Sequence, residues 1–287
     1  MKNDELRIQV TRKNSFPVLY ELNLSEDDSV AMTDEEILAV VKAAAGLGFT
    51  KIRLTGGDPL EREGIIDLVK QIKAVEGIET VSMTTPGRLM PDMAPDLKDA
   101  GLDSVDVRID TFYQEKYIFM TGGGSIDAAM DGLEACQNLG MKPTRALFTM
   151  IDGLNEDEVF DIAQLALNEP IEIVYCEKPE SEELKAENSS GQTLEKSLRF
   201  MPVEEVKKKF KGAVKMPETD KVVDYIKWFE AQSKIGFMGG EKAREFGPEL
   251  LADGRLKMFL FDENPVDISA EVRAMDTEKL AERMKEL

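Results

Sequence analysis

The stretch KIRLTGGDPL, residues 51–60, contains the first residues whose types and spacing can do chemistry. It is a strand-like run that ends in a glycine pair, followed by Asp58 and Pro59. The two glycines let the backbone approach a bound group closely, and Asp58 with the carbonyls of the turn can accept hydrogen bonds from an ammonium group. The alternative is a turn that only terminates the strand, and this stretch alone leaves both interpretations open.

Histidine is absent from all 287 residues. This removes the commonest general base near neutral pH, the commonest transition-metal ligand, and any Ser–His or Cys–His pair. The two cysteines, Cys136 and Cys176, lie far apart in apolar stretches, so we expect small buried thiols in a reducing compartment. Any chemistry must therefore use carboxylates, Lys, Arg, Tyr or a cofactor.

The charge balance excludes other classes of protein. The chain has 56 acidic and 36 basic residues, a net charge of −20, which opposes adhesion to nucleic acid or anionic lipid. The first residues, MKNDELRIQV, lack the apolar core of a signal peptide, and no run approaches the about 18 apolar residues of a membrane span. We expect a cytoplasmic protein that binds neither nucleic acid nor membrane.

Elements of two kinds alternate along the first part of the chain. Short β-rich runs are separated by amphipathic helical stretches, and a capping box at Thr33–Glu36 marks the start of the first long helix. Six such units favour parallel strands covered by helices, in a partial (β/α)6 TIM-like barrel of the α/β class. The loops that follow the strands should then form the active face. The expected strands are 6–11, 51–55, 80–84, 104–109, 144–150 and 171–176.

We predict three regions. Residues 1–178 form the barrel, residues 179–221 form a polar linker that includes a Glu- and Ser-rich stretch, and residues 222–287 form a small C-terminal capping segment. In the last region, Trp228 and Phe229 are expected to anchor the cap to the barrel.

Seven stretches along the chain match one known family in order and spacing. They are LRIQVT at 6–11, KIRLTGGDPL at 51–60, TTPG at 84–87, VRIDT at 107–111, DGLNEDEV at 152–159, SKIGFM at 233–238 and ADGRLKMFLF at 252–261. Through them the chain resembles the radical SAM GTP cyclases of molybdopterin biosynthesis, the MoaA family, over nearly its whole length. The resemblance implies the partial barrel with its cap, two cubane iron–sulfur clusters, and sites for SAM and GTP.

The cluster cysteines that the family requires are absent. The positions that the resemblance implies for them are Asn14, Val18 and Glu21 in the N-terminal loop, and Lys242, Glu245 and Phe259 in the C-terminal segment. Amide, alkyl, ammonium and phenyl groups do not bind iron–sulfide, and isolated carboxylates hold at most a hard ion. We therefore expect no [4Fe–4S] cluster and no metal site, and without a cluster there is no electron for reductive cleavage of SAM.

The implied SAM site is only partly retained. Two departures disfavour SAM: Arg108 replaces a serine of the fourth strand, and Pro86 replaces the asparagine of the TTNG motif. The matching positions are Thr55, Gly56, Gly57, Asp58, Pro59 and Thr84.

The implied phosphate site is better retained. Arg7, Lys51, Arg53 and Arg145 stand where the family places basic residues at the substrate phosphates, so GTP or another phosphorylated ligand is expected as the anion. Cations buried in a barrel need an anionic ligand or carboxylate partners, and acidic neighbours such as Asp58, Asp106 and Asp110 are the alternative.

The guanine contacts are lost. Gly247, Glu249 and Val174 replace family arginines, and the chain ends at KEL without the family's Gly–Gly tail.

Three hypotheses follow. The first is a catalytically silent relative that binds a nucleotide or phosphorylated metabolite, or regulates molybdenum cofactor biosynthesis. The second is a structural partner, as a homodimer or as a heterodimer with an active paralogue. The third is an enzyme with non-radical carboxylate or Mg²⁺-dependent chemistry in the old pocket, whose acids can equally pair with nearby basic residues. Its candidate residues are Tyr20, Glu21, Asp58 and Glu245, and the basic neighbours are Arg12, Lys13, Lys242 and Arg244.

Overall fold

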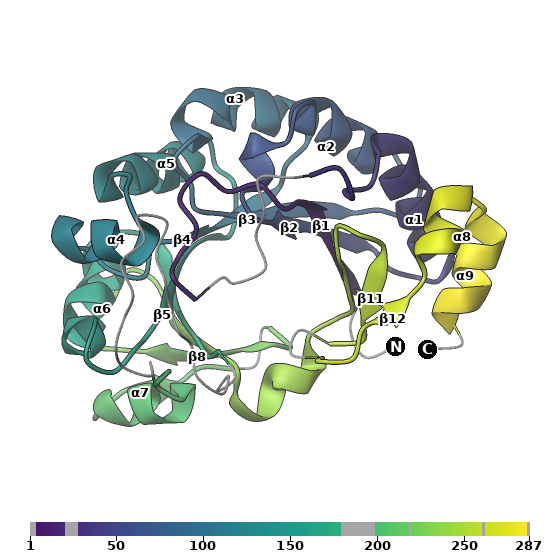
Figure 1. Cartoon of the computed structure of the whole chain (residues 1–287). Helices are drawn as coiled ribbons and strands as arrows, with labels where there is room; N and C mark the ends of the chain where they lie inside the picture. Colours follow the sequence, from purple (N-terminus) through teal and green to yellow (C-terminus); the bar gives the residue numbers. More distant parts are fainter. Residues whose placement is uncertain (1–3, 21–27, 179–198, 218–219, 260–261, 286–287) are drawn as a thin grey trace.

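The computed structural model describes residues 4–20, 28–178, 199–217, 220–259 and 262–285. Their strands form one curled sheet, and helices cover its outer face (Figure 1). Among the helices of these ranges, none is both long and apolar enough to cross a bilayer.

The centre of the sheet is parallel. Its six central strands pair in sequence order, β9 extends it parallel to β6, and β10 extends it parallel to β1. Antiparallel strands finish both ends, so the full order is β12-β11-β10-β1-β2-β3-β4-β5-β6-β9-β8-β7. The strands are β1 (Glu5–Thr11), β2 (Lys51–Gly56), β3 (Thr80–Thr85), β4 (Ser104–Arg108), β5 (Thr144–Thr149), β6 (Glu172–Cys176), β7 (Val214–Lys215), β8 (Val223–Lys227), β9 (Ile235–Met238), β10 (Glu249–Leu250), β11 (Arg255–Lys257) and β12 (Val266–Asp267).

Helices connect the parallel strands across the outer face. The α-helices are α1 (Asp34–Gly46), α2 (Ile65–Lys73), α3 (Met90–Ala100), α4 (Gln114–Thr121), α5 (Ile126–Asn138), α6 (Val159–Asn168), α7 (Val203–Lys209), α8 (Ser269–Ala274) and α9 (Thr277–Lys285). Short 3-10 helices are η1 (Pro59–Glu61), η2 (Glu156–Glu158) and η3 (Gly240–Glu245). The helix α1 begins with the predicted capping box, in which Thr33 and Glu36 each bind the other's backbone.

Apolar and polar side chains alternate along the strands, and this alternation determines which face of the sheet packs against the helices and which faces the lumen. In β1, Leu6 and Ile8 are fully buried, whereas Arg7 and Gln9 point into the barrel and line its cavity. Successive residues of a strand point to opposite faces, so the apolar face packs under the helices and the polar face surrounds the lumen. The inside of this barrel is therefore hydrophilic along much of its height.

The structure confirms the predicted partial TIM-like barrel. All six expected strands are present in the expected order. The strands β9 and β10, which come from the predicted cap, pair directly with the barrel strands β6 and β1. The three-region division stays a prediction. Most of the predicted Glu- and Ser-rich stretch, residues 179–198, lies outside the described residues.

Candidate functional site: a charged barrel cavity

The barrel encloses a cavity of about 1250 Å³. Its walls are the inward side chains of the parallel strands, and its far side is formed by residues of the β8–β12 region. The predicted basic residues Arg7, Lys51, Arg53 and Arg145 all line it, together with Arg108. The fold thus brings the whole implied phosphate set into one space.

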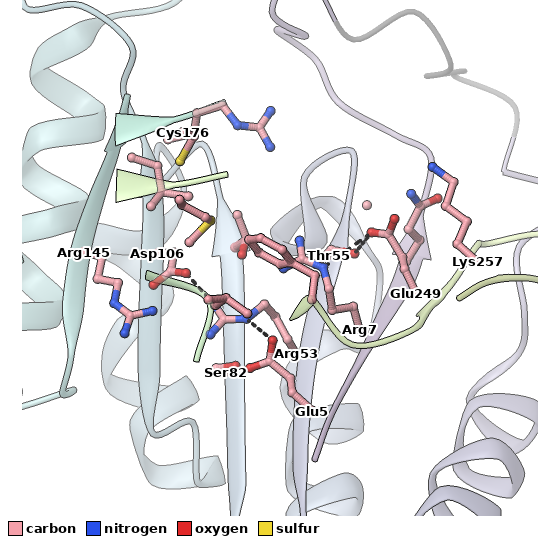
Figure 2. A pocket seen from close by; sticks show the side chains of 18 of the residues that line it. Glu5, Arg7, Arg53, Thr55, Ser82, Asp106, Arg145, Cys176, Glu249 and Lys257 are labelled. Carbon is pink, nitrogen blue, oxygen red and sulfur yellow. Dashed lines mark hydrogen bonds and ion pairs between the residues drawn. The ribbon is translucent and has the colours of Figure 1, made fainter. Parts of the chain in front are cut away.

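Charged side chains from the strands form a belt around the lumen, which we call the charge belt. Arg53 lies at its centre, where Nη1 is 2.6 Å from Asp106 and Nε is 3.1 Å from Glu5 (Figure 2). Each of these side chains is at least mostly buried, so the ion pairs are only weakly screened by solvent. The belt consists of Glu5, Arg7, Arg53, Asp106, Arg145, Glu172 and Glu249.

Other cations of the implied phosphate site have carboxylate partners too. Arg145 lies 3.2 Å from Glu172 and 2.8 Å from Asp220, and Arg7 Nε lies 3.8 Å from Glu249. Lys51, nearer the amino ends of the strands, is 3.2 Å from Asp4. In this structure, carboxylate side chains therefore pair with these cations, as the alternative interpretation predicts. Phosphate binding by the same residues stays a prediction.

The protonation preferences agree with this pairing. Burial by itself raises the pKa of Glu5, but Arg53 and Arg7 outweigh it and hold that pKa below its usual range. Burial likewise opposes a charged Arg53, and Asp106 and Glu5 still raise its pKa. Glu5 and Arg53 thus stabilise each other's charged forms.

The glycine pair of the KIRLTGGDPL stretch makes room for the chain's own backbone. A Cβ at Gly56 would lie 2.3 Å from the carbonyl oxygen of Thr11, and one at Gly57 would lie 2.1 Å from that of Lys13. The amides of Gly57 and Asp58 donate to the same two oxygens. The close approach expected of these glycines is therefore made by the segment that follows β1.

Asp58 is fully buried and is not among the residues that line the cavity. Its Oδ1 accepts hydrogen bonds from Thr85 Oγ1 at 2.7 Å and from the amide of Leu60 at 3.1 Å, and burial raises its pKa. Of the implied SAM positions, Thr55, Gly56, Thr84 and Arg108 line the cavity.

The segment that follows β1 contains the positions that the resemblance implies for the N-terminal cluster cysteines. Asn14 Oδ1 accepts from the amide of Phe16, and Val18 packs against an apolar cluster. Leu19 donates through its amide to Met120 of α4, which ties the segment to the opposite wall. The apolar cluster consists of Leu19, Tyr20, Met120, Ile151 and Phe200. Glu21 lies outside the described residues.

The C-terminal positions also lack a ligand set for iron. Lys242 forms an ion pair with Asp224 at 3.1 Å, Glu245 ends η3, and Phe259 is half-buried. Within the described ranges, no three His, Cys, Asp or Glu side chains are arranged to hold a metal ion. Iron–sulfur clusters are held by thiolates. The donors described at these positions therefore do not fit one.

The cysteines are separate and differently placed. Cys136 of α5 is fully buried as expected, but Cys176 lies at the end of β6 and lines the cavity. Burial raises the pKa of both thiols to about 12, so both are protonated near neutral pH.

A second group of polar residues lies beyond the belt, toward the carboxyl ends of the strands, and we call it the mouth group. It consists of Tyr20, Arg108, Asp110 and Lys178. Tyr20 donates to Asp110 at 2.5 Å, and the ammonium of Lys178 lies 5.2 Å from the centre of the Tyr20 ring. Tyr20, Arg108 and Asp110 are among the residues singled out from the sequence, whereas Lys178 is not. Its place directly after the sixth expected strand is the signal that could have found it.

Comparisons with known proteins agree with this architecture. The family model of the radical SAM superfamily matches residues 17–166. The GTP 3′,8-cyclase of Alkaliphilus oremlandii is 33% identical over 254 residues, which cover 86% of this chain and 77% of that protein. The chain belongs to the MoaA-like radical SAM family.

A second relative supports this membership, and a solved structure shares the fold. The GTP 3′,8-cyclase of Peptoclostridium acidaminophilum is 30% identical over 250 residues, covering 84% of this chain and 74% of that protein. Among solved structures, SuiB of Streptococcus suis superposes with a TM-score of 0.67 at 10% identity, covering 99% of this chain and 68% of that one. The likeness to SuiB concerns the fold alone.

Proposed function

We propose that this family member does not cyclise GTP, and that it binds a small anionic ligand in the barrel cavity instead. In this proposal it carries no iron–sulfur cluster and does not use SAM as a radical source. It acts as a nucleotide-binding, phosphometabolite-binding or regulatory protein related to molybdenum cofactor biosynthesis.

The observation that carries the proposal is the state of the former cluster loop. Residues 12–20 are held by packing and hydrogen bonds of their own, including the Arg88 guanidinium 4.3 Å from the centre of the Phe16 ring. Ser15 donates through its amide to Glu61, which also pairs with Arg88 at 3.3 Å. The side chains of this loop thus hold the loop itself in place, and this supports the proposal that the protein functions without an iron–sulfur cluster.

The retained cavity supports a ligand. A barrel that had only a structural role gains nothing from a hydrophilic lumen of about 1250 Å³, because the same space filled with apolar side chains would bury more surface. The mouth group favours an anion. Arg108 is close enough to lower the pKa of Lys178, so these two cations repel each other, although Asp110 attracts both. An anion bound near them would reduce that repulsion.

The test is a ligand screen on freshly purified protein. Thermal unfolding should shift upward with GTP, GDP or inorganic pyrophosphate, and SAM should give no shift, with native mass spectrometry reporting stoichiometry. The shift should fall in Arg108→Ala and persist in Arg255→Ala, a more exposed cavity cation that pairs with Asp253 at 2.8 Å. Iron bound after reconstitution with iron and sulfide, together with reductive cleavage of SAM, would overturn the proposal.

A second candidate, a structural partner, is favoured by one surface. The strand β7 is an end strand of the sheet, and Val214 on it is 67% exposed. Nearby Phe229, predicted as an anchor, is 70% exposed, while Trp228 packs between Phe160 and Phe210. Open edges and exposed aromatic side chains are common in interfaces. Light scattering after size exclusion, alone and with an active cyclase, tests this candidate, and monomer throughout would count against it.

A further inference from the structure

Lys178 occupies a place in the barrel where a lysine can act as a nucleophile. Cys176, the last residue of β6, lines the cavity, and so do Glu177 and Lys178, which follow it directly. The side chain of Lys178 thus lines the cavity at the carboxyl end of the strands, where the active residues of barrel enzymes lie.

The surroundings of Lys178 favour the neutral amine. No carboxylate within the described ranges forms an ion pair with it, and its ammonium instead faces the ring of Tyr20. Burial and the neighbouring Arg108 lower its pKa to about 8, against the opposing influence of its acidic neighbours. A lysine that is desolvated and close to another cation is an activated nucleophile. The charged or titratable neighbours are Tyr20, Arg108, Asp110, Cys176 and Glu249.

The Tyr20–Asp110 pair places proton-transfer groups on the same side of the cavity. Tyr20 remains protonated, because burial and Asp110 raise its pKa well above 10.0. Asp110 adopts a left-handed backbone conformation, with φ at 64°, and its carbonyl accepts from Asn155 Nδ2 at 2.7 Å. Asp110 Oδ1 accepts from the amide of Thr149 at 2.7 Å. A non-glycine residue held in this conformation by specific bonds is typical of functional sites.

We propose that Lys178 forms a reversible imine with a phosphate-bearing aldehyde or ketone bound in the cavity. The proposal rests on the proposed function, because the ligand occupies the same cavity, and it adds the chemical class of that ligand. Arg108 lies beside Lys178 and supplies charge for the phosphate.

The chemistry balances without an oxidant or reductant. The amine nitrogen of Lys178 attacks the carbonyl carbon, a C–N bond forms, and the carbonyl oxygen takes up a proton. The carbinolamine then loses that oxygen as water, and a C=N bond replaces the C=O bond. The Tyr20–Asp110 pair is placed to pass the proton between nitrogen and oxygen.

The experiment uses pyridoxal 5′-phosphate as the probe aldehyde. The protein is incubated with the probe, reduced with borohydride to fix any imine, digested, and mapped by mass spectrometry. At pH 7 an amine with a pKa near 8 is about 10% neutral, whereas one near 10.4 is roughly 0.04% neutral. Labelling of Lys178 should therefore exceed that of an ordinary lysine by on the order of tenfold to 100-fold.

Matched variants separate the site from general lysine reactivity. Lys178→Arg keeps the positive charge and should abolish the dominant adduct. Lys142→Arg removes an exposed lysine that lines the same cavity, and it should leave the adduct intact. The rate of labelling at Lys178 should rise with pH and reach its half-maximum near pH 8, since the neutral amine is the reactive form.

The failure of this inference can be distinguished from failure of the proposed function. Pyridoxine 5′-phosphate has the same phosphate but no aldehyde, so its thermal shift reports anion binding alone. A shift with this analogue, combined with labelling spread evenly over surface lysines, would overturn the imine and leave anion binding standing. No shift with the analogue and no preferred labelling would overturn both. The wild-type map alone decides between these outcomes, even if a variant fails to fold.

Discussion

The charge belt and the mouth group use similar residues in opposite ways. In the belt, each of the three guanidinium groups has a carboxylate partner, and carboxylates hold the pKa of Arg53 above its ordinary value. In the mouth group, the neighbouring cation Arg108 helps to lower the pKa of Lys178. Charges that neutralise one another stabilise the fold and have little need of a ligand, whereas charges that repel one another gain most from an anion.

The largest expected effect comes from breaking the belt. Asp106→Asn removes the closer of the two carboxylates that face Arg53 and leaves a buried guanidinium with Glu5 alone. Breaking a buried ion pair in this way should lower the free energy of unfolding by about 3–5 kcal/mol, measured by urea denaturation. Asp253→Asn breaks the more exposed pair with Arg255 and should cost less than about 1 kcal/mol. Equal costs for the two variants would contradict a structural role for the belt.

The next effect tests how the glycine pair holds the segment after β1. Gly57→Ala would place a Cβ 2.1 Å from the carbonyl oxygen of Lys13, so the segment must shift. We expect a loss of about 1–3 kcal/mol in unfolding free energy. Gly46→Ala is the control, because its Cβ meets nothing within 4 Å at the end of α1, and it should be neutral or gain up to about 1 kcal/mol. If neither Gly57→Ala nor Gly46→Ala changed the unfolding free energy, the segment after β1 would not pack closely against Gly57.

Within the mouth group, Tyr20→Phe isolates one hydrogen bond. The ring and its edge-to-face packing on Phe200 are kept, and only the 2.5 Å bond to the buried Asp110 is lost. The expected cost is about 1–2 kcal/mol of unfolding free energy, and the pKa of Asp110 should rise further because Tyr20 lowers it. Tyr113→Phe removes a 3.2 Å bond to Asp161 on the exposed surface, and it should leave stability nearly unchanged. If Tyr20→Phe were as stable as Tyr113→Phe, the hydrogen bond between Tyr20 and Asp110 would not contribute to the stability of the fold.

Sequence reasoning reached the fold because its signal is local. The apolar and polar alternation of β1, the capping box at Thr33, and the glycine pair after β2 each need only a few neighbouring residues to be recognised. The predicted set of pocket cations was brought together for the same reason, because inward positions recur every second residue along parallel strands. Arg7 and Arg53, for example, are partners in the register of β1 and β2.

The carboxylate partners could not be predicted in the same way. Arg145 pairs with Asp220, which is 75 residues away in the chain, and Glu249 reaches Arg7 only because β10 pairs with β1. The strand β10 has two residues, too few to show any periodicity. The left-handed backbone at Asp110 and the lowered pKa of Lys178 arise from packing between distant segments, which the sequence alone does not encode in a readable pattern.

The smallest expected effect is a change in the pKa of Lys178, and it tests the difference between the charge belt and the mouth group most directly. Because like-charge repulsion from Arg108 is part of what lowers the pKa of Lys178, Arg108→Gln should raise that pKa and move the labelling midpoint from about 8 toward higher pH. The free energy of unfolding should also change its pH dependence. A lysine whose folded pKa is depressed makes the fold more stable as pH rises from the folded toward the unfolded pKa, so this rise should shrink in the variant. Arg255→Gln, which removes a more exposed cavity cation paired with Asp253, should leave the midpoint in place. A midpoint that is unchanged in Arg108→Gln would mean that Arg108 does not contribute to the lowered pKa of Lys178, and that burial accounts for it.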